Sequence, residues 1–127
     1  GWADPDFDDS SWKRGAPGFG TGNTPAVAVK TRWDSDAIWL RTTLSLPDLK
    51  PTDTLALHLF HDEDVEVFVN GQRLYRAAGF LTSYHDLPLD DRQKALFHPG
   101  PNVVAVTCRQ TAGGQGIDLG LNLVKEE

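Results

Sequence analysis

Methionine is missing from the 127-residue chain, and cysteine occurs once, at Cys108. A single cysteine excludes an intrachain disulfide, and a lone thiol on a strand is usually a small buried apolar group. The first residue is Gly1, not methionine, which leads us to expect a piece of a larger, multidomain protein. No apolar run approaches the length that a membrane helix needs, which argues against a membrane-spanning protein.

Basic residues are also few and scattered. Twelve Lys and Arg stand against eighteen Asp and Glu, which gives a net charge of −6. Nucleic acids and anionic membranes attract proteins through clustered positive charge. We therefore expect neither nucleic acid nor a membrane surface as a partner. The length and the hydrophobic fraction of 39% are typical of a single globular domain over residues 1–127.

What the sequence does contain is a regular alternation of apolar and polar residues, the pattern of half-buried strands. It occurs in residues 38–46, 55–59, 65–69, 104–108 and 117–123, and more weakly at Val27 and Val29. Asn70-Gly71 predicts a hairpin turn, because both central positions of a type I′ turn need a positive φ. A short helix is expected over 90–96, capped by Asp90. The pattern predicts an all-β fold, an antiparallel β-sandwich with one short helix.

The first two dozen residues combine Gly, Pro, Asp and Ser with several aromatic side chains. Free linkers rarely carry many aromatics, so this segment is expected to wrap the domain, with Trp2, Trp12 and Phe19 as anchors. Residues 8–12 are expected to form one helical turn with a capping Asp or Ser side chain.

Four motifs resemble the sugar-binding jelly-roll domain of glycoside hydrolase family 2, in the order that the family shows. They are the entry loop 7–12 (FDDSSW), the strand 37–42 (AIWLRT), the acidic loop and hairpin 62–71 (DEDVEVFVNG) and the strand 99–106 (PGPNVVAV). Together they extend over residues 2–124, nearly the whole chain.

The resemblance implies a galactose-binding-like jelly roll that serves as an accessory domain of a bacterial polysaccharide-degrading enzyme. It implies a secreted, periplasmic or cell-surface location. It also implies a carbohydrate ligand, and the catalytic domain of the same polypeptide as a partner. It does not separate domains that bind sugar from those that only brace a catalytic neighbour.

The acidic loop is the most conspicuous polar cluster. Asp62, Glu63 and Asp64 are predicted carbohydrate-binding residues, because each carboxylate accepts several hydrogen bonds from sugar hydroxyls. The alternative is a solvated strand connection whose charges discourage edge pairing. The same oxygens suit Ca²⁺, but the sequence offers no complete ligand set, so no metal or other cofactor is predicted.

Trp33 and Asp34 form the second candidate, just before the strand 38–46. An exposed indole gives a sugar ring an apolar face to stack on, and Asp34 would supply hydrogen bonds. The alternative is that Trp33 folds back over the end of the sandwich as a lid, and both interpretations stay open. Trp39, within the strand, is instead expected to pack in the core or between the sheets.

Tyr84 and His85 form the third candidate, since each combines a flat apolar body with a polar tip. Packing is the alternative role for Tyr84. The pairs Tyr75-Arg76 and Arg109-Gln110 are expected to line the same end of the sandwich.

No motif points to catalysis by this chain. Glycosidases place two carboxylates across a cleft, and no motif here isolates such a pair. A nucleophile elbow and a zinc-binding helix are also missing from the sequence. The sequence predicts a non-catalytic carbohydrate-binding module, with a structural domain that packs on a catalytic partner as the alternative.

Overall fold

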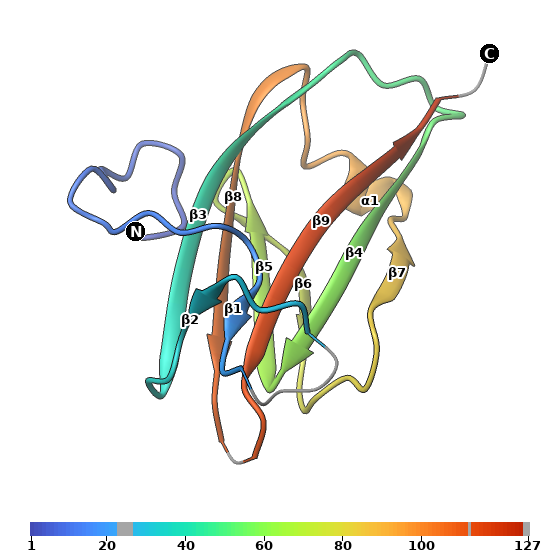
Figure 1. Ribbon diagram of the computed structural model, residues 1–127. Coiled ribbons are helices and arrows are strands. Elements are labelled where there is room, and N and C mark those ends of the chain that lie inside the picture. Colours follow the sequence, from blue (N-terminus) through green and yellow to red (C-terminus); the bar gives the residue numbers. More distant parts are fainter. Residues whose placement is uncertain (23–26, 112, 126–127) are drawn as a thin grey trace.

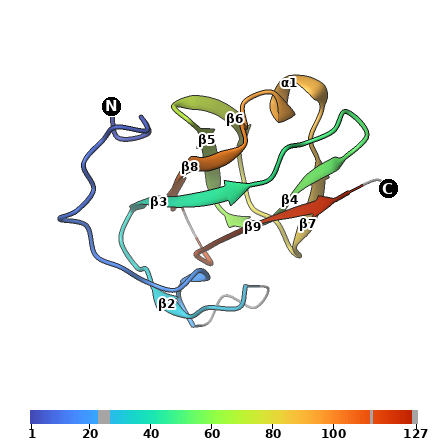
Figure 2. The same cartoon turned by 90° about the horizontal axis from the view of Figure 1, so that it is seen from above.

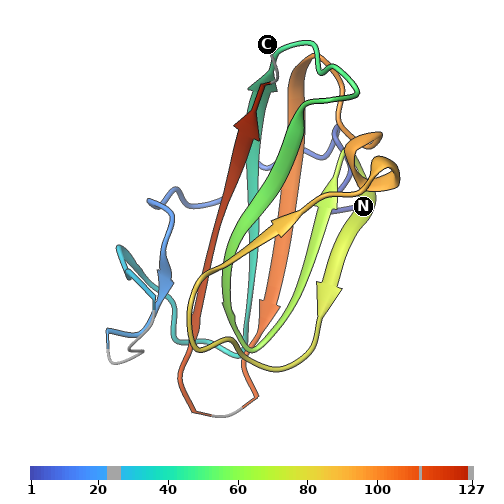
Figure 3. The same ribbon diagram turned by 90° about the vertical axis from the view of Figure 1, so that its right-hand side faces the viewer.

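The computed structural model describes residues 1–22, 27–111 and 113–125, which form two sheets packed as the layers of a β-sandwich (Figures 1 and 3). Sheet A has the order β2-β1-β9-β4-β7 and contains β1 (Phe19–Gly20), β2 (Thr31–Arg32), β4 (Thr54–Asp62), β7 (His85–Pro88) and β9 (Gly116–Val124). Sheet B has the order β3-β8-β5-β6 and contains β3 (Ala37–Leu46), β5 (Asp64–Val69), β6 (Gln72–Ala77) and β8 (Gly100–Arg109).

The strand pairs are antiparallel except for the short parallel pair β1–β2, and the helix is α1 (Asp91–Lys94). The predicted antiparallel β-sandwich with one short helix is therefore confirmed. Among the described residues, no helix is long and apolar enough to cross a membrane.

The alternation of the sequence decides which side chains face the core. The inward residues of both sheets form one apolar cluster, among them Leu55, Leu57, Leu59, Val65, Val67, Val69, Val104 and Val106. Burying a side chain of this size stabilises the fold by about 1.5–3 kcal/mol. Cys108 belongs to the same cluster and is fully buried, as expected for a lone thiol on a strand.

The hairpin between β5 and β6 turns at Asn70 and Gly71, whose φ angles are 51° and 85°, as predicted. The Asn70 side chain donates from Nδ2 to Oδ1 of Asn102 at 2.9 Å. Asn102 is fully buried and donates to the carbonyls of His98 and Gly100. Because the buried Asn102 amide is hydrogen-bonded, it holds the hairpin to β8 without leaving an unsatisfied polar group in the interior.

The helix begins where the sequence predicted it and is shorter. Asp90 Oδ1 accepts the backbone N–H of Gln93 at 2.7 Å, and Gln93 Oε1 accepts the backbone N–H of Asp90 at 2.9 Å. This reciprocal pair is a capping box, which satisfies two otherwise unpaired amides at the helix start.

One expectation about the first third of the chain is wrong, and another holds in part. Val27 and Val29 lie outside the strands, and Val27 is buried because it packs over Gly116, where a Cβ would come within 2.7 Å of its Cγ1. A tertiary contact outweighs local preference there. Residues 8–12 contain a single hydrogen-bonded turn, with Trp12 N–H donating to the Asp9 carbonyl at 2.9 Å, and the turn does not continue as a helix. The expected cap is present, because Asp8 Oδ1 accepts the backbone N–H of Ser10 at 3.0 Å.

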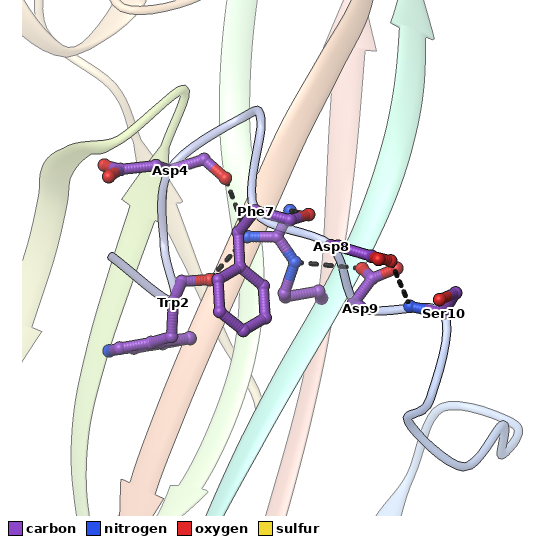
Figure 4. Close-up of polar contacts among 7 residues, drawn as sticks. Trp2, Asp4, Phe7, Asp8, Asp9 and Ser10 are labelled. Atoms are coloured by element: carbon purple, nitrogen blue, oxygen red, sulfur yellow. Dashed lines mark hydrogen bonds and ion pairs between the residues drawn. The ribbon is translucent and has the colours of Figure 1, made fainter.

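Residues 1–12, here called the N-terminal strap, run along the outer face of sheet B (Figure 2). Arg41 on β3 anchors the strap with a side chain that is only 4% exposed. Its guanidinium donates to the backbone carbonyls of Trp2, Asp4 and Phe7 and pairs with the Asp9 carboxylate at 2.9 Å (Figure 4). Five N–H donors in a rigid fork suit this gathering of several acceptors.

The strap covers one row of residues across sheet B. Arg41 pairs in register with Ala105, which pairs with Phe68 on β5. The Trp2 ring packs edge-on against the Phe68 ring, with 5.6 Å between their centroids. Ala105 between them is fully buried although it points away from the core. The prediction that the N-terminal segment wraps the domain is confirmed for the strap, with Trp2 as an anchor. Phe19 packs against the core cluster as expected, whereas the Trp12 ring packs on Phe7 within the strap.

Candidate functional site

The acidic loop lies at the end of the sandwich where β4 ends and β3 and β5 begin, the lower end in Figure 1. Asp62 closes β4, and only 9% of its surface is exposed. Burial raises the pKa of its carboxyl, the neighbouring Glu63 raises it further, and His61 partly offsets both. Asp62 and Glu63 line none of the recesses described below, whereas Asp64 does.

Trp33 is buried, and the predicted stacking platform is wrong. Its indole is 4% exposed and belongs to the core cluster, so neither ring face is open to a sugar. Its backbone N–H donates to the Gly20 carbonyl at 2.9 Å, which holds the residue over the end of the sheets. This is the alternative interpretation, a lid. The neighbouring Asp34 is exposed and pairs with Arg32 at 3.0 Å.

Tyr84 joins separate parts of sheet A. Its hydroxyl donates to Asp118 Oδ2 at 2.7 Å and accepts the backbone N–H of Ala28 at 3.2 Å. Its ring stacks on His58 with 4.9 Å between centroids. Burial, followed by the hydrogen bond to Asp118, raises the pKa of the phenol. These contacts support the packing role for Tyr84, while His85 is exposed at the start of the edge strand β7.

Trp39 is the main correction to the predicted site. Its side chain lies on the outer face of β3 and is 50% exposed, so the predicted packing in the core or between the sheets is wrong. Strand register decides this, because Ile38 and Leu40 on either side of it pack against the core cluster. The alternation in the sequence already carried this signal, and the prediction instead took Trp39 as structural from its place in the strand and from the resemblance of that strand to the family.

A polar recess of about 180 Å³ lies in the outer face of sheet B, near the place where β5 begins and β6 and β8 end. The side chains that give it charge or polarity are Asp64, Glu66, Arg76, Thr107 and Arg109. We call it the outer-face recess. Arg76 and Arg109, expected at a common end of the sandwich, indeed line the same depression.

The register of sheet B places Trp39 beside the outer-face recess. Trp39 pairs with Thr107, Thr107 with Glu66, and Glu66 with Arg76. These four residues form one row across the sheet, next to the row that the N-terminal strap covers. The strap therefore hides one part of the outer face and leaves the indole and the recess open.

Two carboxylates in the recess already have partners. Asp64 Oδ1 accepts the backbone N–H of Gly79 at 2.7 Å. Glu66 Oε2 lies 3.6 Å from Arg73 Nη1, a weak pair between half-exposed side chains. Phe80, which follows Gly79, is 62% exposed and adds a second open aromatic ring near this end.

A second depression has a different character. A cleft of about 360 Å³ opens between β3 and β9, with a lining that includes Leu40, Leu44, Leu119 and Leu121. In the described part of the chain, β1 is the strand that pairs with β9 on this side, and it reaches only Gly116 and Ile117. This apolar cleft is suited to packing against another apolar surface, and it offers few polar groups to a sugar.

The fold is similar to part of a solved protein structure. No protein-family model matches the sequence, and no curated protein matches it. Among solved structures, the crystal structure of a beta-glycosidase from Bacteroides vulgatus is similar, with a TM-score of 0.54 and 17% sequence identity. The match covers 94% of this chain and 18% of that chain. This chain therefore shares its fold with a domain-sized part of a glycosidase and spans less than a fifth of its length.

Proposed function

We propose that this chain is a galactose-binding-like, non-catalytic accessory domain of a secreted or periplasmic glycoside hydrolase, and that it binds carbohydrate at Trp39 and the outer-face recess. The observation that carries the proposal is the half-exposed indole of Trp39 beside charged side chains on a rigid strand. The likeness to a small part of a glycosidase supports the accessory role.

The recess suits binding more than catalysis. At about 180 Å³ it is smaller than the roughly 300–1,000 Å³ of sites that enclose small molecules. Its two carboxylates, Asp64 and Glu66, come from one strand two residues apart, so they lie side by side. A glycosidase needs two carboxylates that face each other across the bond to be cleaved.

The expected interaction free energies are sufficient for millimolar binding. Stacking a sugar ring on Trp39 would bury on the order of 100 Å² of apolar surface, worth about 2.5 kcal/mol. A hydrogen bond to a charged side chain adds about 1.5–3 kcal/mol. Together they reach the roughly 4 kcal/mol that a millimolar dissociation constant requires.

The test is calorimetric titration of the folded domain with a panel of neutral and acidic oligosaccharides. Trp39→Ala should abolish the heat of binding without lowering the melting temperature, because the indole is half exposed. Val124→Ala is the matched control, since Val124 is 60% exposed at the other end of the sandwich, and it should bind as the unchanged domain does. Binding that survives Trp39→Ala would place the ligand elsewhere.

The apolar cleft between β3 and β9 favours a second candidate function, a bracing role in which another domain of the same polypeptide covers the leucines. A titration that is silent across the whole panel, with a domain shown to be folded, would favour this role over carbohydrate binding.

A further inference from the structure

Arg76 and Arg109 line the outer-face recess and are both exposed. Within residues 1–22, 27–111 and 113–125, neither guanidinium has an ion-pair or hydrogen-bond partner. Arg32, Arg41 and Arg73 each pair with a carboxylate, whereas Arg14 and Arg92 also lack an ion pair in the described part of the chain. Arg76 and Arg109 differ from these two because they line one recess together.

The recess is less acidic than the chain as a whole. Its lining contains two guanidinium groups, Arg76 and Arg109, and two carboxylates, Asp64 and Glu66, whose charges sum to zero. The whole chain carries −6. Asp64 and Glu66 also have partners in the Gly79 amide and Arg73, which reduces their repulsion of an incoming anion.

We propose that the ligand of the outer-face recess is an acidic sugar, whose carboxylate or sulfate group is bound by Arg76 and Arg109 while its ring stacks on Trp39. The proposal rests on the proposed function and adds the class of sugar. A guanidinium presents N–H donors in a planar fork that matches a carboxylate or a sulfate, and such charge-assisted bonds are stronger than neutral ones.

A neutral sugar would use the site less well. Its hydroxyls could still donate to the second oxygens of Asp64 and Glu66, because the Gly79 amide and Arg73 each occupy only one oxygen. The guanidinium groups of Arg76 and Arg109 would find only neutral acceptors on such a ligand. An anionic group on the ring gives both arginines a charged acceptor.

The experiment compares trigalacturonate with the same trisaccharide after its carboxyl groups are reduced to alcohols, which keeps the linkage and ring shape. We expect trigalacturonate to bind at least about tenfold more tightly, and Arg76→Gln and Arg109→Gln each to remove most of that advantage. Arg92→Gln, at an exposed position of α1, is the matched control and should change neither affinity. A sulfated galactan oligosaccharide tests the second anionic group, and tight binding of either acidic sugar supports the proposal.

Salt gives an independent measure. Raising the salt from about 0.1 M to about 1 M shortens the Debye length from about 10 Å to about 3 Å. Binding of the acidic sugar should weaken with salt, and binding of the reduced form should not.

The outcomes separate the two proposals. Equal affinity for the acidic and reduced trisaccharides would overturn the acidic-sugar inference and leave carbohydrate binding intact. No binding of any sugar, by a domain whose melting curve shows it to be folded, would overturn the proposed function. Tight binding of an acidic sugar that survives both arginine substitutions would place the anion outside the recess and overturn this inference alone.

Discussion

Asp62, at the residue scale, is a carboxylate that folding makes harder to ionise. Burial raises its pKa above the ordinary value, with Glu63 adding to the effect. A carboxyl whose pKa is higher in the folded state binds its proton more tightly there, so ionisation costs stability. The cost is absent below the unfolded pKa of about 3.9 and is fully present once the pH exceeds the raised folded value.

We therefore expect Asp62→Asn to raise the melting temperature at pH 7 and to lose this advantage as the pH falls below about 4. Melting temperatures of both proteins, measured at about every pH unit between pH 3 and pH 8, test this expectation. Asp6→Asn, at an exposed aspartate, is the control and should leave the profile unchanged. The expectation would be contradicted if the difference in melting temperature between Asp62→Asn and the parent were smaller at pH 7 than at pH 3.

The two tryptophans near β3 show how far single residues could be predicted. The sequence showed Trp39 on the opposite face of the strand from Ile38 and Leu40, which is where the structure places it. The apolar face with Ile38 and Leu40 meets the core, so the local alternation was sufficient to place Trp39 outside. Trp33 precedes the strand on a connection without alternation, so no local pattern could decide between platform and lid.

At the scale of elements, the strap depends on one side chain. Arg41 is nearly buried and gathers three strap carbonyls and the Asp9 carboxylate. Removing one partner from such a network leaves several acceptors unpaired.

Arg41→Ala is expected to lower the free energy of unfolding by about 2–4 kcal/mol and to expose Trp2 to iodide quenching. Urea unfolding followed by tryptophan fluorescence measures the first effect, and iodide quenching of the folded proteins measures the second. Arg32→Ala is the control, because its pair with Asp34 is exposed and should be worth less than about 1 kcal/mol. Equal losses in the two variants would mean that Arg41 does not anchor the strap.

Most elements followed from the sequence, and the reasons are local. The five alternating segments became β3, β4, β5, β8 and β9, and Asn70-Gly71 became the hairpin turn. The short strands β1 and β2 could not be predicted, since two residues carry no periodicity. The recess could not be predicted as a whole either, because β5, β6 and β8 supply its walls and only their pairing brings these together.

For the whole molecule, binding at the recess should appear as added stability, because a ligand that binds only the folded state shifts the unfolding equilibrium. A ligand at about ten times its dissociation constant adds about 1.4 kcal/mol. For a chain of 127 residues this corresponds to a rise in melting temperature of about 5 °C. Scanning calorimetry with and without the tightest ligand of the panel measures the shift, which Trp39→Ala should abolish. A rise that persists in that variant would mean the ligand binds at another place.

The half-exposed position of Trp39 also gives the molecule an optical signal of its own. Of the four indoles, Trp33 lies in the dry core, Trp2 and Trp12 are partly covered within the strap, and Trp39 faces solvent most openly. Emission at the long-wavelength edge of the spectrum therefore comes mainly from Trp39. A sugar that settles on its ring would displace water from that one indole and shift the emission to shorter wavelengths, so occupancy of the recess can be followed without attaching a dye.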